Sequence, residues 1–206
     1  MVRHLPQLFF TTLGERCAAM VLELKTERLV LRPMELGDAD AVYALANNWK
    51  VARMLGRMPF PYKRQDAVDF IGRVTANDGT DGNHVFAVTI GGAFVGACGI
   101  HLRDEHGLFE IGYWLGEPFW GKGYATEAAH RLVRFAFEEM DVERLLAGHF
   151  LDNPASGHVL EKAGFRRVEV IQRECLARGE KVPCAMMELT RAEFEAVPAA
   201  KAAHGA

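Results

Sequence analysis

Two closely spaced glycines, Gly121 and Gly123, are the residues of this sequence with the clearest chemical use. They follow Phe109–Leu115, where apolar residues alternate as in a strand, and precede a segment from Ala125 with the apolar period of one helix face. A backbone without side chains lets a bound group approach closely, and the first turn of a helix has free N–H groups and a dipole that favour an anion. The run W-G-K-G-Y-A-T-E-A therefore predicts a phosphate-binding turn.

The spacing of this turn argues against the common nucleotide motifs. A P-loop places Ser or Thr directly after Gly-Lys, whereas here Lys122 precedes the second glycine. The dinucleotide fingerprint has a third glycine, and Thr126 stands at that position. Two glycines also occur in ordinary tight turns before helices, so a nucleotide-binding protein of another kind remains a distant alternative.

The wider sequence resembles the acetyl-CoA signature of the GNAT acetyltransferase superfamily, Q/R-x-x-G-x-G/A. Gly123 and Ala125 stand at its last two positions, and Trp120 replaces the usual Gln or Arg. A tryptophan there is familiar from RimJ/RimL-type N-acetyltransferases. The chain also resembles that branch in L-K-T-E-R-L-V-L-R-P, from residue 24, and in N-P-A-S-G-H-V-L-E-K-A-G-F, from residue 153. The resemblance spans about residues 24–194.

The resemblance implies an α+β fold in which a mostly antiparallel sheet of about seven strands has helices on both faces. Its fourth and fifth strands would splay apart, and the pantetheine arm of acetyl-CoA would enter the opening. Gly112 fits a bulge or a close backbone approach in the fourth strand. The implied cofactor contacts are Tyr113, Trp114, Leu115, Lys122, Gly123, Tyr124, Ala125, Thr126, Asn153 and Ser156.

Acetyl transfer to an amine requires removal of a proton, because an amine like that of lysine has a pKa of about 10.4. The candidate base is Glu110, which lies between Phe109 and Ile111 at a position where several GNAT enzymes hold theirs. Burial beside apolar groups would make this carboxylate more basic. A strand-end carboxylate facing solvent is the competing interpretation.

Two further groups must serve the reaction itself. The oxyanion of the tetrahedral intermediate needs a donor, and the backbone N–H of Leu115, or of Trp114 beside it, is the candidate. Many GNAT enzymes protonate the departing thiolate from a tyrosine seven residues after the motif asparagine, which is Leu160 here. Ser156 is the substitute candidate, although Ser156 in a first helical turn also competes for backbone bonds, and Asn153 has a rival role as N-cap.

The implied activity is transfer of an acetyl group from acetyl-CoA, as co-substrate, to a primary amine in a ternary complex. The acceptor would be a small-molecule amine or a protein N-terminal α-amine. Asn47–Tyr62 and Ala177–Lys181 are the expected acceptor walls, and Arg53 and Arg57 favour an acidic peptide over a polyamine. The alternative is an acyl-CoA-binding or regulatory protein without turnover, because Leu160 removes the usual acid. The histidines have no metal-ligand spacing, so no metal is expected.

The elements that position these groups can be read from periodicity and turn signals. Helices are predicted at 38–47, 65–75, from 125 to about 140, and from Pro154 to a stop at Gly164. Strands are predicted at 28–34, 84–90, 93–102, 109–115, 145–151, 166–176 and 182–189. Lys162, Arg166 and Arg167 could approach the 3′-phosphate of the cofactor, although a solvated charge cluster is the better explanation for them.

Composition fits one compact cytoplasmic enzyme. With 206 residues and 50% hydrophobic content the chain can bury one core, and we expect the domain at 23–194, an extension at 1–22 and a disordered tail at 195–206. The formal net charge of −3 gives no basic field for nucleic acid, and no apolar run reaches membrane-span length. The four cysteines lack C-x-x-C spacing, so free thiols are expected. Many RimJ/RimL relatives dimerise, which leaves a homodimer open.

Overall fold

The computed structural model describes residues 22–104 and 108–196. Its helices are α1 (Ala39–Ala46), α2 (Trp49–Ala52), α3 (Arg64–Ala76), α4 (Tyr124–Arg134), α5 (Pro154–Lys162) and α6 (Arg191–Ala196). Its strands are β1 (Leu24–Lys25), β2 (Val30–Pro33), β3 (His84–Ile90), β4 (Ala93–Leu102), β5 (Phe109–Leu115), β6 (Arg144–Phe150), β7 (Arg166–Cys175) and β8 (Glu180–Thr190).

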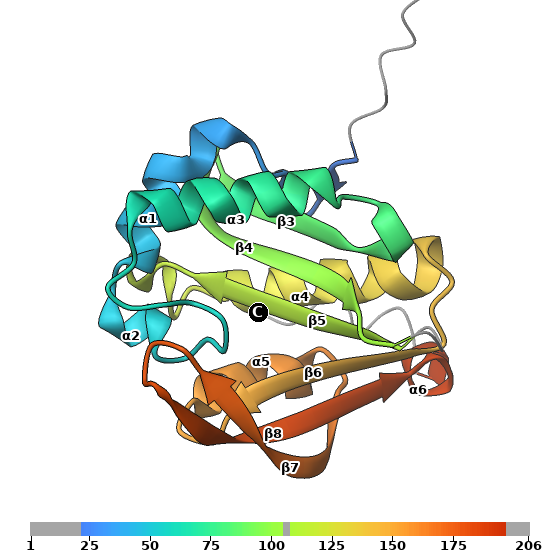
Figure 1. Cartoon of the computed structure of the whole chain (residues 1–206). Helices are drawn as coiled ribbons and strands as arrows, with labels where there is room; N and C mark the ends of the chain where they lie inside the picture. The colour runs from blue at the N-terminus through green and yellow to red at the C-terminus, as the bar shows by residue number, and fades with distance from the viewer. Residues whose placement is uncertain (1–21, 105–107, 197–206) are drawn as a thin grey trace, which may run out of the picture.

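The strands form one sheet in the order β1-β2-β3-β4-β5-β6-β8-β7. Every neighbouring pair is antiparallel except β5 and β6, which are parallel. Helices α1 and α3 cover one face, and α4 and α5 cover the other (Figure 1). The predicted α+β architecture is therefore confirmed, with eight strands in place of about seven because the short strand β1 precedes the first predicted strand.

Two apolar layers hold the helices on the sheet. On the α4 face the fully buried side chains include Phe86, Ile100 and Leu132, and on the α3 face they include Val42 and Ile71. Each strand alternates its side chains between these layers, so the central strands β3 and β4 are apolar on both faces. These two layers hold the sheet, including β5 and β6, in place between the helices.

β5 and β6 separate part way along their length. Their register runs from Phe109 opposite Leu145 to Ile111 opposite Ala147 and goes no further. β5 nevertheless continues beside β4 as far as Leu115. The predicted splay is thus present and starts at Gly112. The bulge that Gly112 could have marked is absent from the β4–β5 ladder, whose register is regular throughout.

Two short helices were not predicted from the sequence. α2 has Asn48 as its N-cap, which accepts a hydrogen bond from the Lys50 amide, in a segment that sequence analysis treated only as a wall of the acceptor site. α6 includes the first two residues of the predicted tail. The rest of that tail and the predicted N-terminal extension, apart from residue 22, lie outside the described residues.

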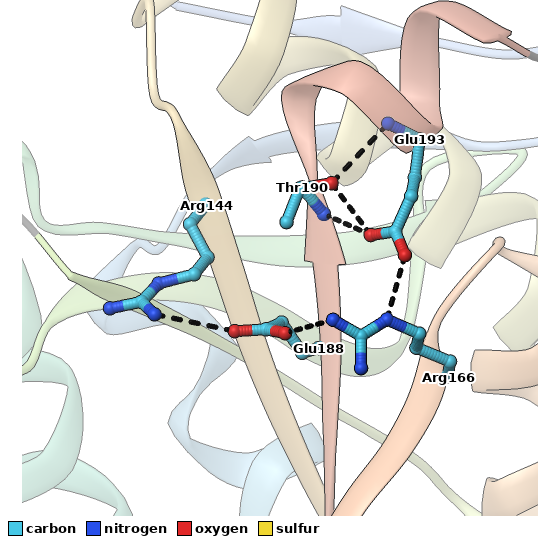
Figure 2. Close-up of polar contacts among 5 residues, drawn as sticks. All are labelled: Arg144, Arg166, Glu188, Thr190 and Glu193. Atoms are coloured by element: carbon cyan, nitrogen blue, oxygen red, sulfur yellow. Dashed lines mark hydrogen bonds and ion pairs between the residues drawn. The ribbon is translucent and has the colours of Figure 1, made fainter.

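A chain of charged side chains fastens α6 to the end of the sheet (Figure 2). Glu193 accepts hydrogen bonds from the Thr190 hydroxyl at 2.7 Å, the Thr190 amide at 2.9 Å and Arg166 Nε at 2.7 Å. Arg166 also pairs with Glu188 at 2.6 Å, and Arg144 approaches Glu188 from the other side (Figure 2). The side chain of Arg166 is therefore bonded to the carboxylates of Glu188 on β8 and Glu193 on α6.

This network gives a pH prediction. The bonds from Thr190, followed by that from Arg166, lower the pKa of Glu193 from 4.5 to about 2. A depressed carboxylate pKa adds stability above about pH 4.5 that is lost as the pH falls toward 2. We expect the melting temperature of Glu193→Gln to fall less over this range than that of the wild type. Equal acid sensitivity in thermal scans would show that Glu193 does not contribute to acid stability.

Candidate active site

The separation of β5 from β6 opens into a cleft of about 1920 Å³. Typical small-ligand pockets are about 300–1,000 Å³, so this cleft has room for two substrates. It extends from the N-terminus of α4, past the ends of β5 and β6, to the loop between α2 and α3. Of the ten predicted cofactor contacts, all except Lys122 line it.

The glycine turn has the geometry that was predicted for it. Gly121 and Gly123 have φ angles of 72° and 79°, which side chains rarely permit, and Gly123 is the N-cap of α4. Glycine brings no capping side chain, so the amides of Tyr124, Ala125 and Thr126 are left to an external acceptor. These amides and the helix dipole suit a phosphate group. Lys122 points its ammonium over the Phe119 ring, 5.8 Å from the centroid.

The segment between β1 and β2 contacts the glycine turn and the first turn of α4. Arg28 bonds Glu127 through Nε at 2.7 Å and donates from Nη1 to the Lys122 carbonyl at 3.0 Å. Thr26 donates to the same carboxylate at 2.5 Å, and the Arg28 amide does so at 2.8 Å. The Arg28 guanidinium also lies 4.8 Å from the centre of the Tyr124 ring. Burial opposes the charge on Glu127, but these donors hold the pKa of that carboxyl below its ordinary value.

These bonds join the T-E-R segment to the W-G-K-G-Y-A-T-E segment, a contact that spacing in the sequence does not reveal. Residues about 100 positions apart meet, since Thr26 and Glu127 are separated by 101 residues. Arg28 fixes both a carbonyl inside the turn and a carboxylate one helical turn later. Its role is to hold the turn in the left-handed conformation that exposes the α4 amides.

The contribution of the Arg28–Glu127 ion pair can be tested by Arg28→Lys, which keeps the positive charge but loses the paired N–H donors of the guanidinium group. Loss of one charge-assisted hydrogen bond predicts roughly tenfold weaker acetyl-CoA binding. Acetyl-pantetheine lacks the pyrophosphate, so its use should be unaffected. Arg134→Lys, which disturbs the exposed Arg134–Glu138 pair on the same helix, is the matched control. Equal losses for both thioesters would show that Arg28 does not act through the phosphate turn.

The two β5 residues considered as oxyanion donors point in opposite directions. The Gly116 amide donates to the Val95 carbonyl of β4 at 2.9 Å. Successive strand amides alternate between edges, so the Leu115 N–H is directed away from β4 and into the opening, as is that of Tyr113. The N–H of Trp114 is directed toward β4. Of the predicted pair, Leu115 has the required orientation.

Trp120 fixes this end of β5. Its indole Nε1 donates to the Leu115 carbonyl at 2.7 Å, on the side of the strand that faces the opening. The Leu115 carbonyl is thus bonded to Trp120, and the Gly116 N–H of the same peptide group is bonded to β4. The tryptophan that replaces the usual Gln or Arg of the signature therefore has a structural role beside the cleft.

A hydroxyl pair links β5 to α5 across the opening. The Tyr113 hydroxyl is 2.9 Å from Ser156 Oγ and 3.0 Å from the Ser156 carbonyl oxygen. Burial raises the pKa of Tyr113 to about 12, so the phenol stays protonated at neutral pH. Leu160 lies in the core, 1% exposed, and Asn153 accepts the Ser156 amide as the predicted N-cap. A tyrosine is thus present near the expected acid position, but it comes from β5 rather than from α5.

Glu110 lies in the cleft wall, but its surroundings differ from the apolar setting that was expected. Its two oxygens bond Arg173 at 2.6 and 3.1 Å, and Arg103 lies 3.2 Å away. The carboxylate is therefore held as a charged partner of two guanidinium groups. The sequence spacing could not show this, because Arg173 comes from β7, 63 residues later.

Side chains are missing from one strip of the same wall. Gly99 on β4 stands opposite Gly112 on β5, between the pair His101 and Glu110 and the pair Ala97 and Trp114. A Cβ added to Gly112 would meet nothing within 4 Å. We call this strip the glycine hollow. It is open toward the α3 side of the sheet, where the acceptor walls were predicted.

The first predicted acceptor wall, Asn47–Tyr62, lines the cleft with several residues, whereas Ala177–Lys181 contributes only Lys181. Arg53 pairs with Asp152 at 2.8 Å, and Arg178 pairs with the same carboxylate at 2.9 Å. Arg57 lines the cleft and makes no ion pair with the described residues. Of the two arginines predicted to favour an acidic acceptor, Arg57 is therefore the one that keeps its charge for the cleft. Lys162, the last residue of α5, also lines the cleft.

The described ranges, 22–104 and 108–196, contain no group of three or more His, Cys, Asp or Glu side chains that could hold a metal ion. Within the same ranges no helix is long and apolar enough to cross a membrane. Cys98, Cys175 and Cys184 are buried free thiols.

Comparison with known proteins places this cleft in a family. The sequence profile of the acetyltransferase (GNAT) domain matches residues 28–166. The chain is 30% identical over 174 residues to p20 of Bacillus licheniformis, an uncharacterized N-acetyltransferase, across 83% of this chain and 97% of that protein. The chain belongs to the GNAT acetyltransferase family, as the sequence resemblance predicted.

Solved structures agree on the fold. A GNAT-family acetyltransferase from Bacillus anthracis superposes with a TM-score of 0.72 at 25% identity, covering 83% of this chain and 99% of that one. The ribosomal L7/L12 α-N-protein acetyltransferase RimL, solved with coenzyme A, has a TM-score of 0.73 at 16% identity, covering 82% and 98%. The microcin C7 self-immunity acetyltransferase MccE, solved with acetyl-CoA and AMP, superposes with a TM-score of 0.72 at 21% identity, covering 80% of this chain and 93% of that one. These three structures therefore share the fold of this chain.

Proposed function

We propose that this protein transfers the acetyl group of acetyl-CoA to a primary amine by direct attack in a ternary complex. The observation that carries the proposal is the opening between β5 and β6, which joins the phosphate-binding turn at one end to the glycine hollow at the other. A cofactor bound along it would place its phosphates at α4 and its thioester beside β5.

The cleft supplies a group for each stage of acyl transfer. The amides of Tyr124, Ala125 and Thr126 would hold the pyrophosphate, and Asn153 would meet the pantetheine arm. The N–H groups of β5 that face the opening, that of Leu115 among them, would stabilise the oxyanion. The protonated hydroxyl pair Tyr113 and Ser156 would deliver a proton to the departing thiolate. The acceptor amine would lose its proton beside the part of the cleft wall that contains Glu110.

For the acceptor we propose the α-amine of a peptide with acidic residues. Three guanidinium groups, from Arg57, Arg103 and Arg173, face the same part of the cleft as Glu110. This excess of positive charge would attract an acidic peptide and repel spermine. An α-amine also titrates near about 7.7–8.0, so its deprotonation costs less than that of a lysine side chain.

The experiment is a kinetic comparison of an acidic N-terminal peptide, its N-blocked form and spermine, following both free CoA thiol and acetylated product. The proposal predicts one thiol per N-acetyl group, no product from the blocked peptide, and the highest kcat/KM for the free peptide. Higher kcat/KM for spermine would reverse the choice of acceptor. Tight acetyl-CoA binding without turnover on any amine would instead identify an acyl-CoA-binding protein.

A further inference from the structure

His101 borders the glycine hollow on β4. It stands opposite Glu110 in the β4–β5 register, so both side chains project from the same face of the sheet. The imidazole folds back over Gly99, where an added Cβ would lie 3.4 Å from His101 Nε2. The side chain lines the cleft and is exposed to it. One ring nitrogen is thereby directed to the strip where the wall has no side chains.

The hollow is where an attacking amine has access to the thioester. Gly112 immediately precedes Tyr113, whose N–H faces the opening, and Gly112 is also the first β5 residue beyond the paired part of β5 and β6. An acceptor that enters from the α3 side must cross Gly99 and Gly112 to reach a carbonyl held at the opening. The imidazole of His101 lies along that path.

We propose that His101 Nε2 accepts the proton from the acceptor amine, and that Glu110, held by its two arginines, stabilises the imidazolium that forms. This inference rests on the proposed acetyltransferase function and changes the part played by Glu110 within it. A carboxylate that already bonds Arg173 twice and contacts Arg103 has few free lone pairs for a further proton. It still provides a negative charge across the strand from the imidazole.

The charges around His101 keep it ready to accept a proton. Separation from water and then the charge of Arg57 lower its pKa from 6.5, Arg103 acts in the same direction, and Glu110 opposes them. The ring is therefore neutral at pH 7. Other charged groups that line the cleft from neighbouring elements are Asp66, Asp69 and Arg73 of α3 and Arg173 of β7.

The proton and electron balance of the step is complete without a further reagent. The ammonium proton moves to His101 Nε2 and then to solvent, and the freed lone pair forms the C–N bond at the acetyl carbonyl. The C–S bond breaks as the tetrahedral intermediate collapses. The thiolate takes a proton from the Tyr113 and Ser156 hydroxyl pair, which in turn recovers one of the two protons left on the amine nitrogen, and the other stays on the amide. The products are the acetylated amine and CoA thiol.

The test is the pH dependence of kcat/KM for the acceptor in His101→Gln and Glu110→Gln. Loss of the general base predicts about a hundredfold lower kcat/KM at pH 7 for His101→Gln, with loss of the acid limb and unchanged acetyl-CoA affinity. Glu110→Gln should keep an acid limb but move it to lower pH, because the imidazolium loses its anion. His130→Gln is the control, since His130 lies on α4 and bonds the Lys162 carbonyl.

Two outcomes would overturn the inference, and each is distinct from failure of the proposed function. A wild-type kcat/KM and acid limb in His101→Gln would exclude His101 as the base while acetylation itself continued. Independently of turnover, NMR titration of the wild type should give a His101 pKa below the ordinary 6.5 that falls further in Glu110→Gln. A His101 pKa above 6.5, or one insensitive to Glu110, contradicts the inference even if no amine is acetylated.

Discussion

Replacing Gly123 with aspartate is expected to weaken acetyl-CoA binding by about a hundredfold or more. The residue has a φ of 79° and forms the N-cap of α4, so an aspartate would place a carboxylate beside the amides that are proposed to bind the pyrophosphate. Like charges placed together cost several kcal/mol, and about 1.4 kcal/mol corresponds to tenfold in affinity. Calorimetric titration of the variant with acetyl-CoA measures the loss directly.

Aspartate at this position need not unfold the protein. Asp81 and Asp141 already hold φ angles of 51° and 57° in this chain. Gly91→Asp is the control for backbone strain, since Gly91 has a φ of 55° in the β3–β4 turn, whereas an added Cβ at Gly123 would also lie 3.2 Å from Arg28 Nη2. Gly123→Asn separates charge from size and should lose less affinity. Wild-type binding by a folded Gly123→Asp would remove the phosphate-turn assignment.

Filling the glycine hollow is expected to abolish acetyl transfer while sparing cofactor binding. Gly112→Val introduces a side chain where an added Cβ meets nothing, and valine suits a strand, so the fold should tolerate it. The branched side chain would occupy the path from the α3 side to the thioester. We expect kcat/KM for the amine to fall by about a hundredfold or more, the scale on which small misplacements of reacting groups act.

Side-chain size at this position provides the control. Gly112→Ala should lie between glycine and valine in activity, and both variants should bind acetyl-CoA nearly as the wild type does. Gly99 is unsuitable for the same test, because its added Cβ would lie 2.7 Å from the His84 carbonyl oxygen. Full activity in a folded Gly112→Val would show that the acceptor does not approach over this strip.

Local patterns predicted the elements and the turn well. The glycines at 121 and 123, the N-cap Asn153 and the hairpin of β7 and β8 are set by residues close in sequence, where backbone preferences act directly. The splay of β5 from β6 followed from the family resemblance, because strand periodicity alone does not tell where a ladder ends.

Contacts between distant segments were beyond what spacing could predict. Arg28 reaches Glu127 across 99 residues, and Arg173 reaches Glu110 across 63. The acid expected at the position of Leu160 has its proposed replacement in the pair of Tyr113 and Ser156, and that pairing depends on how α5 packs beside β5. His101 had no motif of its own, and its orientation over Gly99 becomes visible only when β4 and β5 are in register.

Amide hydrogen exchange with and without acetyl-CoA tests the central claim, that the cofactor lies between β5 and β6 with its phosphates at α4. We expect slower exchange at the amides of Tyr113 and Leu115, which face the opening, and at residues 124–126 of the turn. Strands β1 and β2, which lie at the far edge of the sheet, should be unchanged. If saturating acetyl-CoA left the exchange of these β5 and α4 amides unaltered, the cofactor could not lie between β5 and β6 with its phosphates at α4.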